Sequence, residues 1–205
     1  MHSRIDFKLI LITDSNLNKN LIRVISEACK AGVKAVQVRE KNISAKELLK
    51  LSKKIRTITN KTKARLLIND RYDIALLADA DGLHTPEKGI NPLQLKNNKL
   101  IIGRSVHSLI SAVEAENLGF DYIIFGPVFR TPAKIKYGSP QGIKNLKQVC
   151  GTVKIPVFAV GGINPLRSKK CINAGAHGVA VIREIMNSKN IRKTVNEFKA
   201  SMGNL

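Results

Sequence analysis

Short apolar runs alternate with amphipathic stretches along most of the chain. Between the runs, apolar positions recur at a spacing of three and four residues, which is the period of a helix with one buried face. The apolar runs predict strands over residues 7–12, 33–38, 65–68, 82–83, 100–102, 121–125, 157–160 and 178–181. The stretches between and after them predict helices over residues 17–30, 45–58, 72–78, 92–96, 109–118, 142–149, 165–174 and 195–202.

Strands that alternate regularly with helices predict an α/β protein with a parallel sheet. Eight strand–helix units in a chain of 205 residues favour a closed (β/α)8 TIM barrel. The competing arrangement, a doubly wound open sheet, usually has fewer strands and does not close on itself. We therefore expect a single TIM-barrel domain over residues 1–205.

The working side chains of a TIM barrel lie at the carboxyl ends of its strands, which meet at one mouth. Candidates for the site can therefore be collected as the polar residues and glycines that follow the predicted strands. They are Thr13, Asp14, Gln37, Arg39, Lys41, Asn69, Asp70, His84, Arg104, Ser105, His107, Thr131, Lys134, Gly161, Gly162 and Arg183. We expect these residues to converge on the mouth.

The second predicted strand leads into Gln37, Arg39 and Lys41 at alternate positions. Because side chains alternate between the faces of a strand, these three are expected to point the same way. An arginine fork and a lysine ammonium in one file suit the grip of a phosphate or a diphosphate. The alternative is a polar strand end whose basic side chains only extend into water.

Gly161 and Gly162 follow the seventh predicted strand, and Ile182 and Arg183 follow the eighth. Glycines let backbone N–H groups approach an anion closely, and the start of a helix favours negative charge. Because these two loops often form the phosphate site of a TIM barrel, we expect a phosphate cradle here. Taken alone, two adjacent glycines would indicate only a tight turn.

Asn69 and Asp70 end the third predicted strand with an amide and a carboxylate. Such oxygen ligands suit a Mg²⁺ ion that the protein and the substrate phosphates hold jointly. The alternative is that Asp70 caps the following helix. Later in the chain, residues 126–138 form a long predicted loop in which Thr131 and Lys134 could meet phosphate oxygens. The alternative for that segment is a mobile surface loop.

The formal net charge of +20 is the one extreme of the composition. This excess fits small phosphorylated substrates, and it also fits nucleic acid or a membrane surface. The basic residues are spread over helical faces without interleaved aromatic residues, which argues against nucleic acid and for a solvated basic surface. No apolar run reaches membrane-spanning length and the first residues lack the apolar core of a signal peptide, so we expect a cytoplasmic protein.

Several short motifs occur in order along the chain: Gln37-Val38-Arg39-Glu40-Lys41, Ile68-Asn69-Asp70-Arg71, Asp81-Gly82-Leu83-His84, Gly126-Pro127-Val128-Phe129, Thr131 with Lys134, Ala159-Val160-Gly161-Gly162-Ile163 and Ala174-Gly175-Ala176-His177-Gly178-Val179-Ala180-Val181. Together, over about residues 8–186, they resemble the thiamine phosphate synthase/TenI superfamily. The resemblance implies a (β/α)8 barrel that binds thiazole phosphate, and a homodimer. It also implies that a synthase joins thiazole phosphate to hydroxymethylpyrimidine diphosphate with Mg²⁺ as cofactor.

The resemblance further implies a role for each matching residue. The diphosphate side comprises Gln37, Arg39, Lys41, Ser105 and Lys134, of which Arg39, Ser105 and Lys134 are the expected catalytic residues. The other matches are Asn69 for substrate, Asp70 for metal, Thr131 for thiazole phosphate, and Gly161, Gly162, Ile182 and Arg183 for its phosphate cradle. His84 and His107 complete the expected substrate-binding set.

Departures from the synthase pattern leave alternatives open. The second metal-binding Asp of the family falls on Gly89, and Glu87 could act as that ligand from two residues away. The turn around Ser105 is similar to that of the TenI branch, which includes thiazole tautomerases that isomerise carboxythiazole phosphate without a metal. The histidine that carries the proton in those enzymes is replaced here by Pro127.

A tautomerase would therefore need His84 or His107 as its proton carrier, a task that suits a histidine near neutral pH. The intact file of Gln37, Arg39 and Lys41 instead favours an enzyme with a diphosphate substrate. We expect a thiamine phosphate synthase first and a tautomerase second. A non-catalytic relative that binds thiazole phosphate or has a regulatory role is the remaining alternative.

Overall fold

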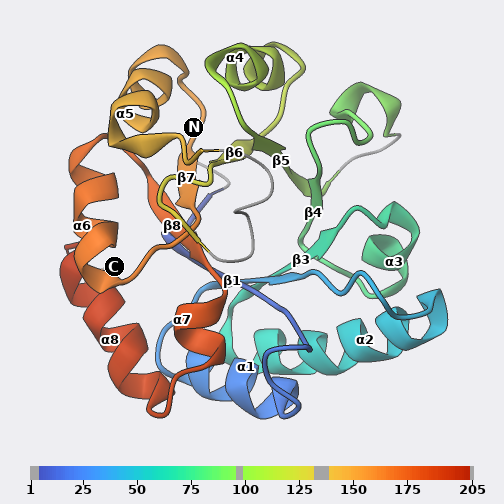
Figure 1. Cartoon of the computed structure of the whole chain (residues 1–205). Coiled ribbons are helices and arrows are strands. Elements are labelled where there is room, and N and C mark those ends of the chain that lie inside the picture. Colours follow the sequence, from blue (N-terminus) through green and yellow to red (C-terminus); the bar gives the residue numbers. More distant parts are fainter. Residues whose placement is uncertain (1–4, 96–98, 132–138, 204–205) are drawn as a thin grey trace.

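The computed structural model describes residues 5–95, 99–131 and 139–203. Its strands form one closed parallel barrel, in which consecutive strands pair and β8 pairs with β1 (Figure 1). The predicted TIM barrel is confirmed, and the open-sheet alternative is excluded. The strands are β1 (Leu9–Ile12), β2 (Ala35–Val38), β3 (Arg65–Asn69), β4 (Gly82–Thr85), β5 (Ile101–Val106), β6 (Tyr122–Phe125), β7 (Val157–Val160) and β8 (Gly178–Val181).

The helices surround the ring of strands (Figure 1). In place of the fourth predicted helix, the described residues form a short 3-10 turn, η1 (Pro92–Gln94). The sequence pattern also missed α7, which follows β8 directly and precedes the last helix. None of the described helices is long and apolar enough to cross a membrane. The α-helices are α1 (Leu21–Lys30), α2 (Ala45–Thr62), α3 (Tyr72–Leu77), α4 (Leu109–Asn117), α5 (Gly142–Thr152), α6 (Pro165–Asn173), α7 (Arg183–Met186) and α8 (Ile191–Ser201).

The limits of α2 follow from local chemistry. The Ser44 hydroxyl accepts a hydrogen bond from the Glu47 backbone N–H at 3.2 Å, and the Glu47 carboxylate accepts one from the Ser44 N–H at 2.9 Å. Such a capping box satisfies two N–H groups that the helix cannot pair. The helix ends at Thr62, and the next residue, Lys63, has a left-handed φ of 54°. The sequence prediction stopped one turn short because the last turn is polar.

Aromatic side chains fill the amino-terminal half of the barrel interior. Phe7, Tyr122 and Phe158 pack together with ring centroids 5.5 to 6.2 Å apart. The Tyr122 ring occupies the space beside Gly103, where an added Cβ would lie 2.0 Å from the ring carbon Cζ. Glycine at position 103 is therefore what allows a large ring on the neighbouring strand to point inward.

Two strands extend further toward the mouth than the apolar pattern predicts. β4 continues through His84 and Thr85, and β5 continues through Ser105 to Val106. The ladder pairs His84 with Gly103 and Ser105 with Ile124, so these polar residues belong to the sheet. An apolar run ends at the first polar residue, whereas backbone hydrogen bonds between strands can continue past it. His84 and Ser105 are therefore held by the barrel wall and not by loops above it.

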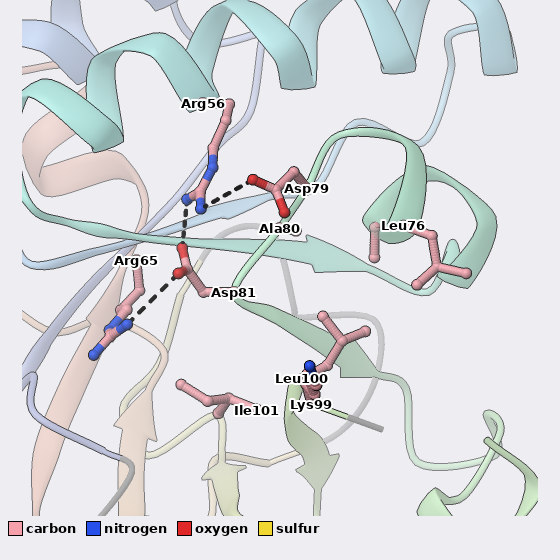
Figure 2. Close-up of a pocket in the computed structure, with 10 residues that line it drawn as sticks. Arg56, Arg65, Leu76, Asp79, Ala80, Asp81, Lys99, Leu100 and Ile101 are labelled. Atoms are coloured by element: carbon pink, nitrogen blue, oxygen red, sulfur yellow. Dashed lines mark hydrogen bonds and ion pairs between the residues drawn. The ribbon is translucent and has the colours of Figure 1, made fainter. Parts of the chain in front are cut away.

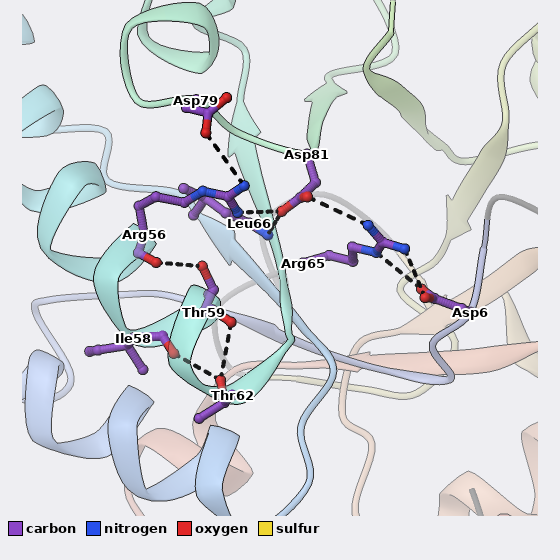
Figure 3. Close-up of polar contacts among 9 residues, drawn as sticks. All are labelled: Asp6, Arg56, Ile58, Thr59, Thr62, Arg65, Leu66, Asp79 and Asp81. Atoms are coloured by element: carbon purple, nitrogen blue, oxygen red, sulfur yellow. Dashed lines mark hydrogen bonds and ion pairs between the residues drawn. The ribbon is translucent and has the colours of Figure 1, made fainter.

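Ion pairs hold the opposite, amino-terminal end of the barrel together (Figure 3). The Asp81 carboxylate accepts hydrogen bonds from Arg56 Nη1 at 2.6 Å and from the Leu66 N–H at 2.8 Å. Its other oxygen lies 3.6 Å from Arg65 Nη1, and Arg65 also pairs with Asp6 at 2.8 Å. Asp81 thus links α2 to the start of β3 just before the chain enters β4.

A cavity of about 400 Å³ lies beside these ion pairs (Figure 2). Its charged lining includes Arg56, Arg65 and Asp81, which already neutralise one another. The cavity opens between the start of β3 and the start of β5, away from the carboxyl ends of the strands. We therefore assign this region to stability and look for function at the mouth.

Replacing Asp81 with Asn should lower the free energy of unfolding by about 2 to 3 kcal/mol, because the half-buried guanidinium of Arg56 would lose its charged partner. Asp79→Asn is the matched control: its carboxylate is 94% exposed and lies 3.8 Å from the same arginine, so its loss should cost less than about 1 kcal/mol. Urea unfolding of both variants measures the difference. Equal losses would show that Asp81 is not the central partner.

Candidate active site

Gln37 brings an unpaired oxygen to the mouth. The residue lies near the end of β2, faces the interior and is 1% exposed. Its side-chain Nε2 donates a hydrogen bond to Asn69 Oδ1 at 3.0 Å, whereas its Oε1 has no partner among the described residues. Buried polar atoms are nearly always hydrogen-bonded. The free Oε1 is therefore a position at which an N–H group of a ligand can bind.

Arg39 follows β2 at the same end of the barrel and carries a positive charge. Its backbone N–H donates to Thr13 Oγ1 at 3.0 Å, which ties the end of β2 to β1. The side chain is half-buried, and no described residue forms an ion pair or hydrogen bond with its guanidinium. A partly desolvated arginine without a protein partner suits an anionic ligand.

The expected file of three side chains forms only in part. β2 ends at Val38, so strict strand alternation applies to Gln37 and no longer governs Arg39 or Lys41. The charge of Arg39 contributes to the lowered pKa of His84 inside the barrel, after the larger effect of burial. Lys41 is exposed beyond it. Whether Lys41 contacts a ligand stays a prediction.

Asp70 presents a free carboxylate directly after β3. Its backbone N–H donates to the His84 carbonyl at 2.9 Å, and its φ of 64° lies in the left-handed region. The side chain is exposed and has no hydrogen-bond or ion-pair partner among the described residues. The alternative role of a helix cap is wrong, because the cap position of α3 is Arg71 and no side chain caps that helix.

The residues at the mouth fit a metal only if a substrate supplies further ligands. Among the described residues, no three His, Cys, Asp or Glu side chains converge in a way that could hold a metal ion. Mg²⁺, however, commonly binds one or two protein carboxylates together with substrate phosphates and water. Asp70, whose carboxylate no described residue occupies, fits that mode of binding.

The resemblance assigns a second metal carboxylate to position 89, where this chain has a glycine. A Cβ at Gly89 would lie 2.8 Å from Pro86 Cδ and 3.0 Å from Thr85 Cβ, so this turn leaves little room for a side chain. The Glu87 carboxylate accepts a hydrogen bond from the His107 backbone N–H at 3.2 Å. Glu87 thus braces the end of β5, and its role as a metal ligand stays a prediction.

His84 and Ser105 form a hydrogen bond inside the barrel. His84 Nε2 lies 2.9 Å from Ser105 Oγ, and its Nδ1 lies 3.1 Å from the Tyr122 hydroxyl. Burial, and secondarily the charge of Arg39, lowers the pKa of His84 to about 3, so the ring is neutral near pH 7. Because His84 is 1% exposed, it meets a ligand at the mouth through Ser105, which is half-buried.

His107 is held in one orientation by the β6 loop. Its Nδ1 hydrogen-bonds the Gly126 carbonyl oxygen, which can only accept, so Nδ1 carries a hydrogen. Nε2 has no partner among the described residues. The ring is half-buried at the end of β5. This arrangement is compatible with the predicted contact to substrate.

The predicted phosphate cradle has the necessary backbone conformation. Gly161 and Gly162 have φ values of 99° and 63°, which favour glycine, and a Cβ at Gly162 would lie 2.7 Å from the Arg130 carbonyl oxygen. The N–H groups of Gly162, Ile182 and Arg183 donate to no other described backbone group. They are available to an anion at the start of the short helix α7, which Arg183 begins.

The loop after β6 is described only in part. Thr131 is half-buried at its near end and has no hydrogen-bond partner among the described residues. Lys134 lies outside the described residues. The expected diphosphate contact of Lys134 and the thiazole-phosphate contact of Thr131 therefore both stay predictions.

Sequence reasoning missed Tyr122 as part of the site. The residue lies in the apolar run that predicts the sixth strand, and its side chain is fully buried. Its hydroxyl group could have indicated this role, because a buried tyrosine usually needs a hydrogen-bond partner. Because side chains alternate along β4, β5 and β6, that partner, His84, points into the barrel interior together with Tyr122.

The fold and the mouth define a TIM-barrel protein that offers unpaired polar groups to a charged ligand. A model of the thiamine monophosphate synthase family matches residues 9–185. A thiamine-phosphate synthase of Clostridium novyi is 39% identical over 194 residues, which cover 92% of this chain and 95% of that protein. A thiamine-phosphate synthase of Pyrococcus furiosus is 36% identical over 202 residues, which cover 97% of this chain and 96% of that protein.

The solved structures agree with the sequences. The structure of a thiamine phosphate pyrophosphorylase from Pyrococcus furiosus matches with a TM-score of 0.88 at 35% identity, and the match covers 97% of this chain and 96% of that one. The chain therefore belongs to the thiamine monophosphate synthase family. The resemblance drawn from its motifs is confirmed.

The buried His84 should make the protein less stable in mild acid. Its pKa is about 3 when folded and near 6.5 when unfolded, so its contribution is complete above pH 6.5 and is lost as the pH falls below it. The free energy of unfolding should decline by up to about 1.4 kcal/mol per pH unit more in the wild type than in His84→Gln. Urea unfolding between about pH 4.5 and 7 tests this. Parallel curves for the two proteins would contradict a neutral buried His84.

Proposed function

We propose that this protein is a thiamine phosphate synthase, which joins hydroxymethylpyrimidine diphosphate to thiazole phosphate and releases thiamine phosphate and diphosphate. The observation that carries the proposal is an Arg39 guanidinium and an Asp70 carboxylate at one mouth, neither of which has a hydrogen-bond or ion-pair partner among the described residues. The cation suits a phosphate group, and the carboxylate suits a metal bound to that group. Membership of the family supports the same conclusion.

Two sides of the mouth would receive the two substrates. The ends of β2 and β3 carry Gln37, Arg39 and Asp70, which suit a pyrimidine and its diphosphate. The free Oε1 of Gln37 can accept a hydrogen bond from a ring amino group. The loops after β7 and β8 carry Gly162 and Ile182, whose free N–H groups suit the phosphate of the thiazole.

The reaction requires one bond to break and one to form at the same carbon. The bond between the pyrimidine methylene carbon and the diphosphate oxygen breaks, and its electron pair leaves with diphosphate. The thiazole nitrogen then donates its lone pair to the methylene carbon. Arg39 would stabilise the negative charge that develops on the leaving group, and Ser105 would donate a hydrogen bond to it. Lys134 and Lys41 are proposed to add further positive charge there.

Mg²⁺ is the proposed cofactor, and Asp70 is its proposed protein ligand. When bound, the ion would neutralise part of the charge on the departing diphosphate. The free carboxylate of Asp70 is the structural support for this assignment. Arg39 and Ser105 would then hold oxygen atoms of the diphosphate that the ion does not hold, so that the leaving group is oriented before the bond breaks.

The tautomerase alternative has less support. His84 is an unsuitable proton carrier for two reasons. Burial and the charge of Arg39 keep its ring neutral, and Ser105 lies between the ring and the mouth. His107 could serve through its free Nε2. However, the isomerisation of a single monophosphate does not require the side chains of Arg39 and Asp70 at the ends of β2 and β3, which lack partners among the described residues.

Purified protein with Mg²⁺ and both substrates should form thiamine phosphate, and Asp70→Asn should lower kcat about a hundredfold or more, because metal stabilisation of a leaving group contributes several kcal/mol. Asp73→Asn is the matched control. Its carboxylate is already paired with Arg71 at 2.5 Å, so its activity should remain near that of the wild type. Chromatographic detection of thiamine phosphate measures both.

Three results would overturn parts of this proposal. Turnover of carboxythiazole phosphate in the presence of a chelator, without coupling of the two substrates, would make the protein a tautomerase. Binding of thiazole phosphate without either activity would make it a non-catalytic relative. Equal activity of Asp70→Asn and Asp73→Asn would remove Asp70 from the metal site.

Substitutions on the two sides of the mouth should raise the KM of different substrates. Arg39→Ala should raise the KM for the pyrimidine diphosphate about 10- to 100-fold, because a hydrogen bond to a charged group contributes about 1.5 to 3 kcal/mol. Gly162→Ala should instead raise the KM for thiazole phosphate, because its Cβ would collide with the Arg130 carbonyl. Initial rates with one substrate varied at a time distinguish the two effects. The reverse pattern would show that each substrate binds on the side of the mouth that is proposed here for the other.

A further inference from the structure

Tyr122, His84 and Ser105 form a chain of hydrogen bonds from the barrel core to the mouth, which we call the relay. The Tyr122 hydroxyl lies 3.1 Å from His84 Nδ1, and Ser105 Oγ lies 2.9 Å from His84 Nε2. Tyr122 and His84 are 0% and 1% exposed, whereas Ser105 is half-buried. The relay therefore starts in a region closed to water and ends where a ligand can bind.

The relay can run in only one of two directions. Both rings are fully buried, and among the described residues His84 hydrogen-bonds only hydroxyl groups and Tyr122 only His84, which favours the neutral form of each ring. A neutral imidazole has one N–H donor and one acceptor nitrogen. Either Tyr122 donates to Nδ1 and Nε2 donates to Ser105, or Nδ1 donates to Tyr122 and Ser105 donates to Nε2.

The hydroxyl of Tyr122 selects the first direction. It has no hydrogen-bond partner other than His84 among the described residues. If Nδ1 carried the hydrogen, the tyrosine O–H would be buried without an acceptor. Leaving a buried donor unpaired costs about 1 to 3 kcal/mol, which would make that direction the minor one.

In the favoured direction, Ser105 accepts a hydrogen bond from His84 and keeps its own hydrogen free. We propose that Tyr122 is a positioning residue which, through His84, holds the Ser105 hydroxyl as a hydrogen-bond donor for an oxygen atom of the substrate diphosphate. This inference rests on the proposed function. It assigns to Tyr122 a role in diphosphate departure, although the residue cannot touch a substrate itself.

Packing keeps Tyr122 in the orientation that the relay needs. The ring fills the space over Gly103, where an added Cβ would lie 2.0 Å from Cζ, and it meets the Phe158 ring edge to face at a centroid distance of 5.5 Å. The residue therefore has no room to turn its hydroxyl away from His84. Tyr122→Phe removes one oxygen atom and leaves this packing in place.

Nitrogen-15 NMR of the His84 ring tests the direction in the protein without substrates. In the wild type, Nε2 should carry the hydrogen and Nδ1 should have the shift of a hydrogen-bonded acceptor. In Tyr122→Phe, the Nδ1 signal should move toward that of an unbonded nitrogen. A wild-type His84 with its hydrogen on Nδ1 would overturn the proposal, whatever reaction the protein catalyses.

Kinetics test the consequence for Ser105. Tyr122→Phe should lower kcat about three- to tenfold, the worth of one hydrogen bond, and should leave the KM for thiazole phosphate unchanged. In a Ser105→Ala background, the same change should have less than a twofold effect, because the relay would have no end group. Thr59→Val, which removes a buried hydroxyl that bonds the Arg56 carbonyl on α2, should leave kcat unchanged in both backgrounds.

Failure of this inference differs from failure of the proposed function. If the wild type makes no thiamine phosphate, the proposed function is wrong, and the NMR shifts still decide the direction of the relay. If the wild type is active but Tyr122→Phe lowers kcat equally with and without Ser105, Tyr122 does not act through the relay. A loss of kcat in Tyr122→Phe that Thr59→Val matches would likewise assign it to general stability.

Discussion

Every polar group inside a closed barrel must find a hydrogen-bond partner, and the mouth of this protein depends on that constraint. Strand alternation points Gln37 and His84 into the interior together with apolar residues. Asn69 satisfies one end of Gln37, and Ser105 and Tyr122 satisfy both nitrogens of His84. At the mouth, Gln37 Oε1 and the half-buried Arg39 guanidinium have no partner among the described residues and are therefore informative. In a protein of this kind, the missing partner is expected to be a ligand.

The same constraint divides the barrel into two ends with different tasks. Asp81 and His84 belong to one four-residue motif, yet Asp81 joins the ion pairs at the amino-terminal end and His84 joins the relay. The cavity of about 400 Å³ lies with Asp81, which pairs there with Arg56 and Arg65. Motif residues that look equivalent in the sequence can therefore serve stability and function separately, as the two faces of a TIM barrel generally do.

The sequence was sufficient for the architecture and for the neighbourhood of the site. Apolar runs located every strand, and polar residues after them pointed to Gln37, Asp70 and Gly162. The pattern could not reveal that β4 and β5 continue through polar residues, because backbone pairing and not hydrophobicity extends them. It also could not reveal Tyr122, whose polar role depends on a partner from another strand.

The resemblance assigns the second metal carboxylate to position 89, which is a glycine in this chain. Pro86 and Thr85 crowd position 89, and Glu87 is turned toward the backbone of His107. In the proposed function, Asp70 is then the main protein ligand for the metal, and less negative charge opposes the diphosphate. More of the leaving-group charge would fall to Arg39 and to the donor hydrogen of Ser105. The direction of the Ser105 hydroxyl, and hence Tyr122, would matter more in this chain than in a relative with both carboxylates.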